Sequence, residues 1–306
     1  MFDDIIENSL NVYNKHHNKT GEKDLVINIL TSKTPTILLG KKHAQFPSIV
    51  CKVYYRQIGI NSFFFTKDLF FQYFGFYILD ISHYAKYDLL FYKYIEGDIL
   101  RKLQRQEWNI SFSILQSYLK NAPSNNHFDI TVFTKSVQRK LDMLIPLGLI
   151  DSKEQKKADL YIQQINKIFH DSKCKTKMQH GDFSLYNIIK NKNNYYIIDW
   201  DEYGIHQNPL YDLSNLIIGL IYIYQETDNN INNGISKVKF SIGNKLDAIF
   251  TILNLNIDLF YSLFSLYCIE RLYNTIYIYR NIMHAKKLSM TIKKIYSIDD
   301  WLDLRK

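Results

Sequence analysis

Cysteine is scarce in this sequence, and the cysteines that occur form no recognisable pair. Cys51, Cys174 and Cys268 are far apart, odd in number, and include no C-x-x-C spacing. This pattern excludes a disulfide framework and a cysteine-based zinc site as organising features. It is typical of a protein kept in a reducing compartment, and we expect a cytoplasmic location.

Long hydrophobic runs are missing as well. The most apolar stretch, 213–224, falls short of the roughly 20 residues that a helix needs to cross a bilayer. The first residues, MFDDIIENSLNVYNKHH, are acidic and amphipathic, and they lack the basic and apolar regions of a signal peptide. Hydrophobic residues still make up 46% of the 306 positions, which is enough for a large core. We therefore expect a soluble folded protein with no membrane partner.

The positive charge is spread along the chain rather than concentrated. Lysine and arginine (38 residues) outnumber aspartate and glutamate (30 residues), for a formal net charge of +8 at pH 7. A nucleic-acid-binding protein is one class that such a charge allows. However, the cations stand singly or in pairs such as Lys41–Lys42, and no polybasic arm or known nucleic-acid-binding module is present. We expect no nucleic-acid partner.

The secondary structure that the sequence predicts changes near Gly97. Before it, β-branched and aromatic runs separated by turn residues predict strands at 24–32, 34–40, 48–55, 76–81 and 87–95. Apolar residues three and four apart predict a helix over 62–76. Beyond Gly97, helical patterns dominate, with an interruption at 178–204. The predicted fold class is α+β, with a small antiparallel β-rich N-terminal lobe (1–95) and a larger, mainly helical C-terminal lobe (96–306).

The interruption itself, MQHGDFSLYNIIKNKNNYYIIDWDEYG, is rich in acidic side chains. His180-Gly181-Asp182 is followed by four residues and Asn187, and Asp199 ends an apolar run twelve residues later. Phosphoryl transfer needs a carboxylate that orients the acceptor hydroxyl and takes its proton, and oxygen ligands that hold Mg²⁺ against the ATP phosphates. Asp182 suits the first task, and Asn187 and Asp199 suit the second. A plain strand ending in a polar hairpin is the alternative interpretation.

The combined motif resembles the aminoglycoside phosphotransferase and choline kinase superfamily, whose catalytic loop begins H-G-D or H-N-D and whose metal-binding aspartate lies in I-D-W or I-D-F. The sequence "NPLYDL" (208–213) also matches. The resemblance implies a bilobal protein-kinase-like fold that uses ATP and Mg²⁺, with Asp182 as catalytic base and Asn187 and Asp199 as metal ligands. It further implies that His180 and Asp212 support the catalytic loop.

Two acidic residues follow Asp199, and their roles differ. Asp201 either assists the metal or loop geometry or has no role, and both possibilities stay open. For Glu202 we expect a solvated side chain without a function.

The N-terminal lobe should hold the nucleotide if the resemblance is correct. Lys52, in "SIVCKVYY" (48–55), is the candidate that contacts the α- and β-phosphates. Family members pair this lysine with an acid on the next helix, and Asp68 is the candidate here, one methylene shorter than glutamate. No G-x-G-x-x-G loop is present, and the turn that carries Ser32 takes its place. The backbone near Tyr94 and Ile95 would bind adenine at a hinge.

The acceptor is less well defined. The region 210–285 offers few acids and many tyrosines, so an aromatic cage for an amine or sugar and a tyrosine-rich core are both open. Glu270 is a possible substrate-binding acid. The predicted function is ATP-dependent transfer of a phosphoryl group to a hydroxyl of a small-molecule substrate: a sugar or glycan precursor, an amino alcohol such as choline, or an aminoglycoside. The alternative is a catalytically impaired kinase-like nucleotide-binding protein. The sequence leaves the oligomeric state open.

Overall fold

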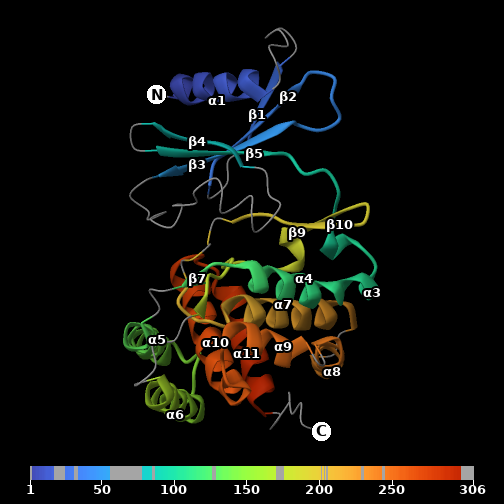
Figure 1. The fold of residues 1–306 in the computed structure, drawn as a ribbon. Coiled ribbons are helices and arrows are strands. Elements are labelled where there is room, and N and C mark those ends of the chain that lie inside the picture. The colour runs from blue at the N-terminus through green and yellow to red at the C-terminus, as the bar shows by residue number, and fades with distance from the viewer. Residues whose placement is uncertain are drawn as a thin grey trace. The chain divides into compact units, whose positions relative to one another are not determined.

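The computed structural model describes most of the chain, in two compact units (Figure 1). One unit comprises Met1–Lys102 with Ile188–Ile198, and the other comprises Leu103–Asn187 with Asp199–Lys306. The described residues are 2–16, 25–30, 34–55, 78–84, 87–125, 129–169, 176–200, 202, 204, 206–228, 231–242 and 245–297. The helix predicted over 62–76, with Asp68, lies outside them, as do Ser32 and Asp201.

The first unit is built on an antiparallel sheet. In the described residues its strand order is β1-β2-β3-β5-β4, and all neighbouring strands are antiparallel. The bounds are Leu25–Leu30 (β1), Thr36–Lys41 (β2), Ile49–Tyr55 (β3), Ile78–Tyr84 (β4) and Tyr87–Lys93 (β5). Each of the five predicted strands therefore has its counterpart in the structure.

An amphipathic helix packs on this sheet. Helix α1, Phe2–His16, buries Ile5, Val12 and Tyr13 in one hydrophobic cluster with Leu39 and Phe91 of the strands. Figure 1 shows α1 running along the sheet. The alternating strand pattern buries one face of the sheet, and the helix covers that face with its apolar side.

A second, smaller sheet belongs to the same unit. Strands β9 (Ile188–Asn191) and β10 (Asn194–Ile197) form a hairpin, and β9 also pairs with β6 (Asp98–Ile99). Gly97, at φ +148°, sits so close to this hairpin that a Cβ atom there would collide with the Lys190 carbonyl. The hairpin lies between the two candidate metal ligands, Asn187 and Asp199, in the sequence.

The second unit is mainly helical. The long helix α10 (Phe260–Tyr277) is largely buried and contacts α5, α6, α7 and α11. The other bounds are Arg105–Trp108 (α3), Ile110–Asn121 (α4), Ile130–Leu144 (α5), Ser152–Phe169 (α6), Tyr211–Asp228 (α7), Ile231–Ile242 (α8), Lys245–Leu253 (α9) and Ile282–Ser297 (α11). Short elements connect them: the 3₁₀ turns at Leu100–Lys102, Ile145–Leu147, Leu185–Asn187 and Ile257–Leu259, and the pair β7 (Ser124–Asn125) and β8 (Thr176–Lys177).

Local sequence explains where these helices begin. The side chain of Asp129 caps α5 by accepting hydrogen bonds from the backbone N–H groups of Thr131 and Val132. Among the described helices, none is by itself long and apolar enough to cross a membrane; a bent pair, Lys245–Leu253 with Ile257–Tyr277, meets the length and composition test. A sheet-bearing N-terminal region followed by a helical C-terminal part confirms the predicted α+β class.

Candidate active site

Asp182 lies in a loop between β8 and β9 that ends in the 3₁₀ turn Leu185–Asn187. This turn carries the Asn187 side chain back onto the aspartate. The Asn187 amide nitrogen, Nδ2, donates to the Asp182 main-chain oxygen at 2.8 Å and to its carboxylate oxygen Oδ2 at 2.9 Å. The four-residue interval of the D-x-x-x-x-N motif thus corresponds to one closed turn in which the two side chains meet.

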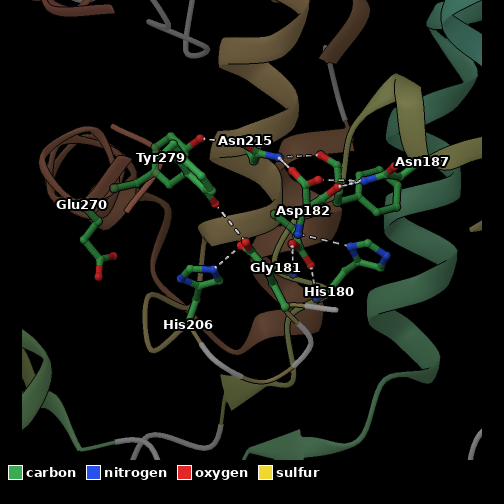
Figure 2. Close-up of polar contacts among 12 residues, drawn as sticks. His180, Gly181, Asp182, Asn187, His206, Asn215, Glu270 and Tyr279 are labelled. Carbon is green, nitrogen blue, oxygen red and sulfur yellow. Dashed lines mark hydrogen bonds and ion pairs between the residues drawn. The ribbon is translucent and has the colours of Figure 1, made fainter. Parts of the chain in front are cut away.

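Asn215 contacts the same carboxylate from the other side (Figure 2). Its Nδ2 lies 3.3 Å from Asp182 Oδ1 and 3.2 Å from the Phe183 carbonyl oxygen. Its own Oδ1 accepts a hydrogen bond of 2.8 Å from the Tyr267 hydroxyl. Sequence reasoning missed Asn215, although a signal existed: it stands three residues after Asp212, on the same face of α7.

Asp212 is fully buried beneath the loop, in the first turn of α7. Its carboxylate accepts hydrogen bonds from the backbone N–H groups of His180 and Gly181, the latter at 2.8 Å. Burial raises the pKa of Asp212 to about 7, and these backbone donors act in the opposite direction. The carboxylate therefore connects the start of α7 to the start of the loop.

His180 is also fully buried. Its Nδ1 lies 3.2 Å from the backbone nitrogen of Asp182 and accepts that N–H. The imidazole packs against Trp200, with ring centroids 4.5 Å apart. Figure 2 shows the ring turned toward the backbone of the loop. These contacts hold the loop backbone at Asp182.

The backbone conformation at position 181 requires glycine. Its φ of +91° lies in the left-handed region, and a Cβ atom would collide with the carbonyl of Glu202. The adjacent segment is held to the loop by a hydrogen bond from the Gly204 N–H to the Gln179 carbonyl, 2.8 Å long. We call His180, Gly181, Asp182, Asn187, Asp212 and Asn215 the loop network.

Asp199 follows the β9–β10 hairpin and adopts a left-handed φ of 63°, which aspartate tolerates better than most residues. Its negative charge acts on Asp182 and raises the pKa of that carboxyl. The Asn187 amide nitrogen donates hydrogen bonds to Asp182, and the side-chain carbonyl oxygen of Asn187, Oδ1, can still act as an acceptor. One carboxylate and one amide oxygen fit Mg²⁺, which completes its coordination with substrate phosphates and water.

The pKa of Asp182 is raised from 3.8 to about 6. Burial is the largest cause, and the nearby Arg271 guanidinium lowers the pKa again. The charges of Glu202 and Asp199 raise it, while the hydrogen bond from Asn187 lowers it. The result is a carboxylate that is ionised at neutral pH and more basic than an ordinary aspartate.

A second group of side chains surrounds Glu202, and we call it the outer cluster: Glu202, His206, Tyr211, Arg271 and Tyr279. One carboxylate oxygen of Glu202 accepts from the Tyr279 hydroxyl at 2.9 Å, and the other lies 3.0 Å from His206 Nε2. The His206 ring stacks on Tyr211 at 3.5 Å. With 17% of its side chain exposed, Glu202 is not the solvated residue that the sequence predicts.

Arg271 is the charged member of the outer cluster that sequence reasoning missed. Its guanidinium lies 5.8 Å from the centre of the Tyr279 ring, a cation–π contact. Burial would lower its pKa, but Asp182 and the neighbouring tyrosines raise it above the ordinary value. Arg271 is therefore a permanent cation that acts on the Asp182 carboxylate.

The candidate nucleotide-binding residues lie in the first unit. Lys52 is on β3, half-buried, opposite Thr36 of β2 and Leu90 of β5. Tyr94 and Ile95 directly follow β5; the Tyr94 N–H donates to the Ser48 carbonyl at 3.0 Å, and the Tyr94 ring stacks on the Phe46 ring with centroids 5.9 Å apart.

Glu270 is buried on α10 and forms an ion pair with Lys140 of α5, with Nζ and Oε1 2.8 Å apart. In Figure 2 it lies apart from the hydrogen-bonded residues around Asp182. The structure does not bring Glu270 into contact with the loop network.

Comparison with known proteins agrees with this architecture. A family model for the RIO domain, a protein-kinase-like atypical kinase domain, matches residues 99–212. No curated protein matches the sequence. Among solved structures, the GDP complex of wild-type aminoglycoside 2'-phosphotransferase-IIIa is 12% identical, with 94% of this chain and 98% of that chain covered and a TM-score of 0.57.

Two further structures are similar. The apo form of a thermostable mutant of aminoglycoside phosphotransferase APH(4)-Ia is 12% identical, with 95% and 99% of the two chains covered and a TM-score of 0.55. A glucosamine kinase is 13% identical, with 94% of this chain and 85% of that chain covered and a TM-score of 0.53. The chain thus has the bilobal fold of kinase-like phosphotransferases.

Proposed function

We propose that this protein is an ATP- and Mg²⁺-dependent phosphotransferase that acts on a hydroxyl group of a small molecule, and that it belongs with the small-molecule kinases of the aminoglycoside phosphotransferase and choline kinase superfamily. The observation that carries the proposal is the loop network. Within it, the Asp182 carboxylate is held by Asn187 and Asn215 at distances of 2.9 and 3.3 Å.

Asp182 is the proposed general base. As the acceptor hydroxyl oxygen forms its bond to the γ-phosphorus, the bond from that phosphorus to the bridging oxygen of ADP breaks, and the hydroxyl proton passes to Asp182. A general base works best when its pKa is close to the working pH. The pKa of about 6 for Asp182 meets this condition and keeps the carboxylate ionised at pH 7.

Asn187 and Asp199 are the proposed ligands of Mg²⁺, which supplies neutralisation of the phosphate charge when it is bound. Asn187 has a second task, because its amide nitrogen orients the base. His180 and Asp212 hold the backbone that carries Asp182. Asp201 is proposed as an accessory residue of the same segment.

For the nucleotide, we propose Lys52 as the phosphate-binding lysine, with Asp68 as its acidic partner. Ser32 and the backbone at Tyr94 and Ile95 complete this proposed site. ATP is the proposed nucleotide; similar structures contain AMP-PNP, ADP or GDP.

The acceptor class is proposed from the same comparison. The similar structures include a hygromycin B complex and a glucosamine complex. A sugar or glycan precursor, an amino alcohol or an aminoglycoside is the corresponding class here, and Glu270 is a proposed, more remote contact for an amine.

The test is an ATP-consumption screen of the purified protein with sugars, sugar acids, choline, ethanolamine and kanamycin-type compounds. Asp182→Ala serves as the inactive control, and Mg·ATP binding is measured by calorimetry in both proteins. Turnover that depends on Asp182 supports the proposal. Measurable Mg·ATP binding without turnover of any acceptor would instead favour the impaired kinase-like binding protein.

A further inference from the structure

Arg271 is a half-buried cation with an incomplete set of protein partners. Its guanidinium contacts the Tyr279 ring, but in the described part of the chain it forms no hydrogen bond or ion pair. Arginine carries five N–H donors, and withdrawing them from water without acceptors is costly. An arginine in this state is suited to a ligand that supplies the missing acceptors.

The surroundings of Arg271 connect it to the catalytic carboxylate. Tyr267 stands one helical turn before it on α10, on the same face of the helix. The Tyr267 hydroxyl donates to Asn215, whose amide nitrogen donates to Asp182. Arg271 also acts electrostatically on Asp182. The cation therefore borders the region where the acceptor hydroxyl has to approach the base.

The carboxylates of Glu202 and Asp182 are already engaged in hydrogen bonds. Glu202 receives hydrogen bonds on both carboxylate oxygens, from Tyr279 and His206. Asp182 receives them from Asn187 and Asn215. Neither carboxylate forms an ion pair with the guanidinium, so the charge of Arg271 is left to attract a further anion.

Tyr211 provides a second observation. Its side chain is fully buried between His206 and Tyr267, with ring centroids at 3.5 and 5.0 Å. Its hydroxyl has no hydrogen-bond partner within the described residues. A buried hydroxyl without a protein partner is uncommon, and such a group can donate to an oxygen atom of a ligand. Tyr211 and Arg271 thus both offer unused donors within the outer cluster.

We propose that Arg271, assisted by the Tyr211 hydroxyl, recognises an anionic oxygen group, a carboxylate or phosphate, on the acceptor whose hydroxyl is phosphorylated. This inference rests on the proposed function and narrows it: an acceptor that presents an ammonium group at this position is repelled by Arg271. Bidentate N–H donors of arginine match the geometry of carboxylate and phosphate oxygens.

The experiment compares acceptors that share vicinal hydroxyls and differ in charge: glycerate, glycerol and 3-amino-1,2-propanediol, with glucuronate and glucose as a second pair. Rates are measured at pH 8, where Asp182 is ionised, for wild type, Arg271→Gln, Arg271→Lys and the exposed-arginine control Arg139→Gln. We expect wild type to prefer the anionic member of each series. Arg271→Gln should lower kcat/KM for the anions about 10- to 100-fold, mainly by raising KM. The kcat/KM values for the neutral compounds should stay within about threefold of wild type. Arg271→Lys, which keeps the charge, should retain part of the preference for anions.

Two results overturn the inference. One is an equal loss of kcat for all acceptors in Arg271→Gln, which would assign Arg271 to the transferred phosphoryl group. The other is a preference of wild type for the cationic compound. A binding arm separates this inference from the proposed function: glycerate and glucuronate are titrated calorimetrically into each variant with Mg·ADP present. Anion binding that is lost in Arg271→Gln supports the anion site even without turnover. If neither anion binds to the wild-type protein, the anion site is refuted.

Discussion

The two sides of Asp182 differ in how completely the protein satisfies its own polar groups. In the loop network, backbone and side-chain donors close on Asp182 and Asp212 from several elements. In the outer cluster, Arg271 and the Tyr211 hydroxyl keep unused donors among the described residues. A closed network holds a catalytic group in one geometry, whereas unused donors leave room for a ligand. We infer that the first side determines the reaction and the second determines the acceptor.

The largest effect should come from Asp182 itself. Asp182→Asn keeps the shape of the side chain but removes the base, and we expect kcat to fall about 10²- to 10⁴-fold. Mg·ATP affinity, measured by calorimetry, should change little because Asp182 is not a proposed metal ligand. Full activity in the variant would show that another group takes the proton.

Removing a donor from the loop network should have a smaller effect. Asn215→Leu deletes the hydrogen bond to Asp182 Oδ1, and we expect kcat/KM to fall about 10- to 100-fold, the cost of one hydrogen bond to a charged group. Tyr267→Phe is the matched comparison, because it keeps the ring and removes only the hydroxyl that donates to Asn215. A larger loss of kcat/KM in Tyr267→Phe than in Asn215→Leu would contradict the proposal that the Tyr267 hydroxyl supports Asp182 through Asn215.

Backbone strain at the loop should appear as lost stability. Gly181→Ala combines a left-handed φ with a collision against the Glu202 carbonyl. We expect the free energy of unfolding, from urea titration, to fall by about 1–3 kcal/mol. Gly148→Ala is the control, since Gly148 has a φ of +67° but no atom within 4 Å of the new Cβ. Equal losses in the two variants would mean that the collision is relieved by a local shift.

The outer cluster should give the smallest change. Glu202→Gln removes a negative charge that raises the pKa of Asp182, so this pKa should fall. The acid limb of the pH–rate profile should then move to lower pH. Arg271→Gln should move it in the opposite direction, because the Arg271 charge lowers the same pKa. Shifts of the same sign would contradict the opposing charges.

Much of the fold could be predicted because the signals are local. Alternating β-branched runs identify the strands of the first unit, and the four-residue interval between Asp182 and Asn187 corresponds to one turn. The outer cluster could not be predicted in this way. Tyr279, two residues beyond the end of α10, donates a hydrogen bond to Glu202 across 77 residues of sequence. No spacing rule connects such positions, which is why Glu202 was misjudged and Arg271 was missed.

The pH dependence of kcat/KM tests the central claim most directly, because it reports the ionisation of the base in the free enzyme. Asp182 must be ionised to accept the hydroxyl proton. Activity should therefore be present above the pKa of Asp182 and fall as the pH drops through about 6, because this one carboxylate takes up a proton. In Asp182→Asn, the residual activity should show no such limb. A wild-type profile that is flat between pH 5 and 8, or a limb near 6 that survives in Asp182→Asn, would contradict the assignment of Asp182 as the catalytic base.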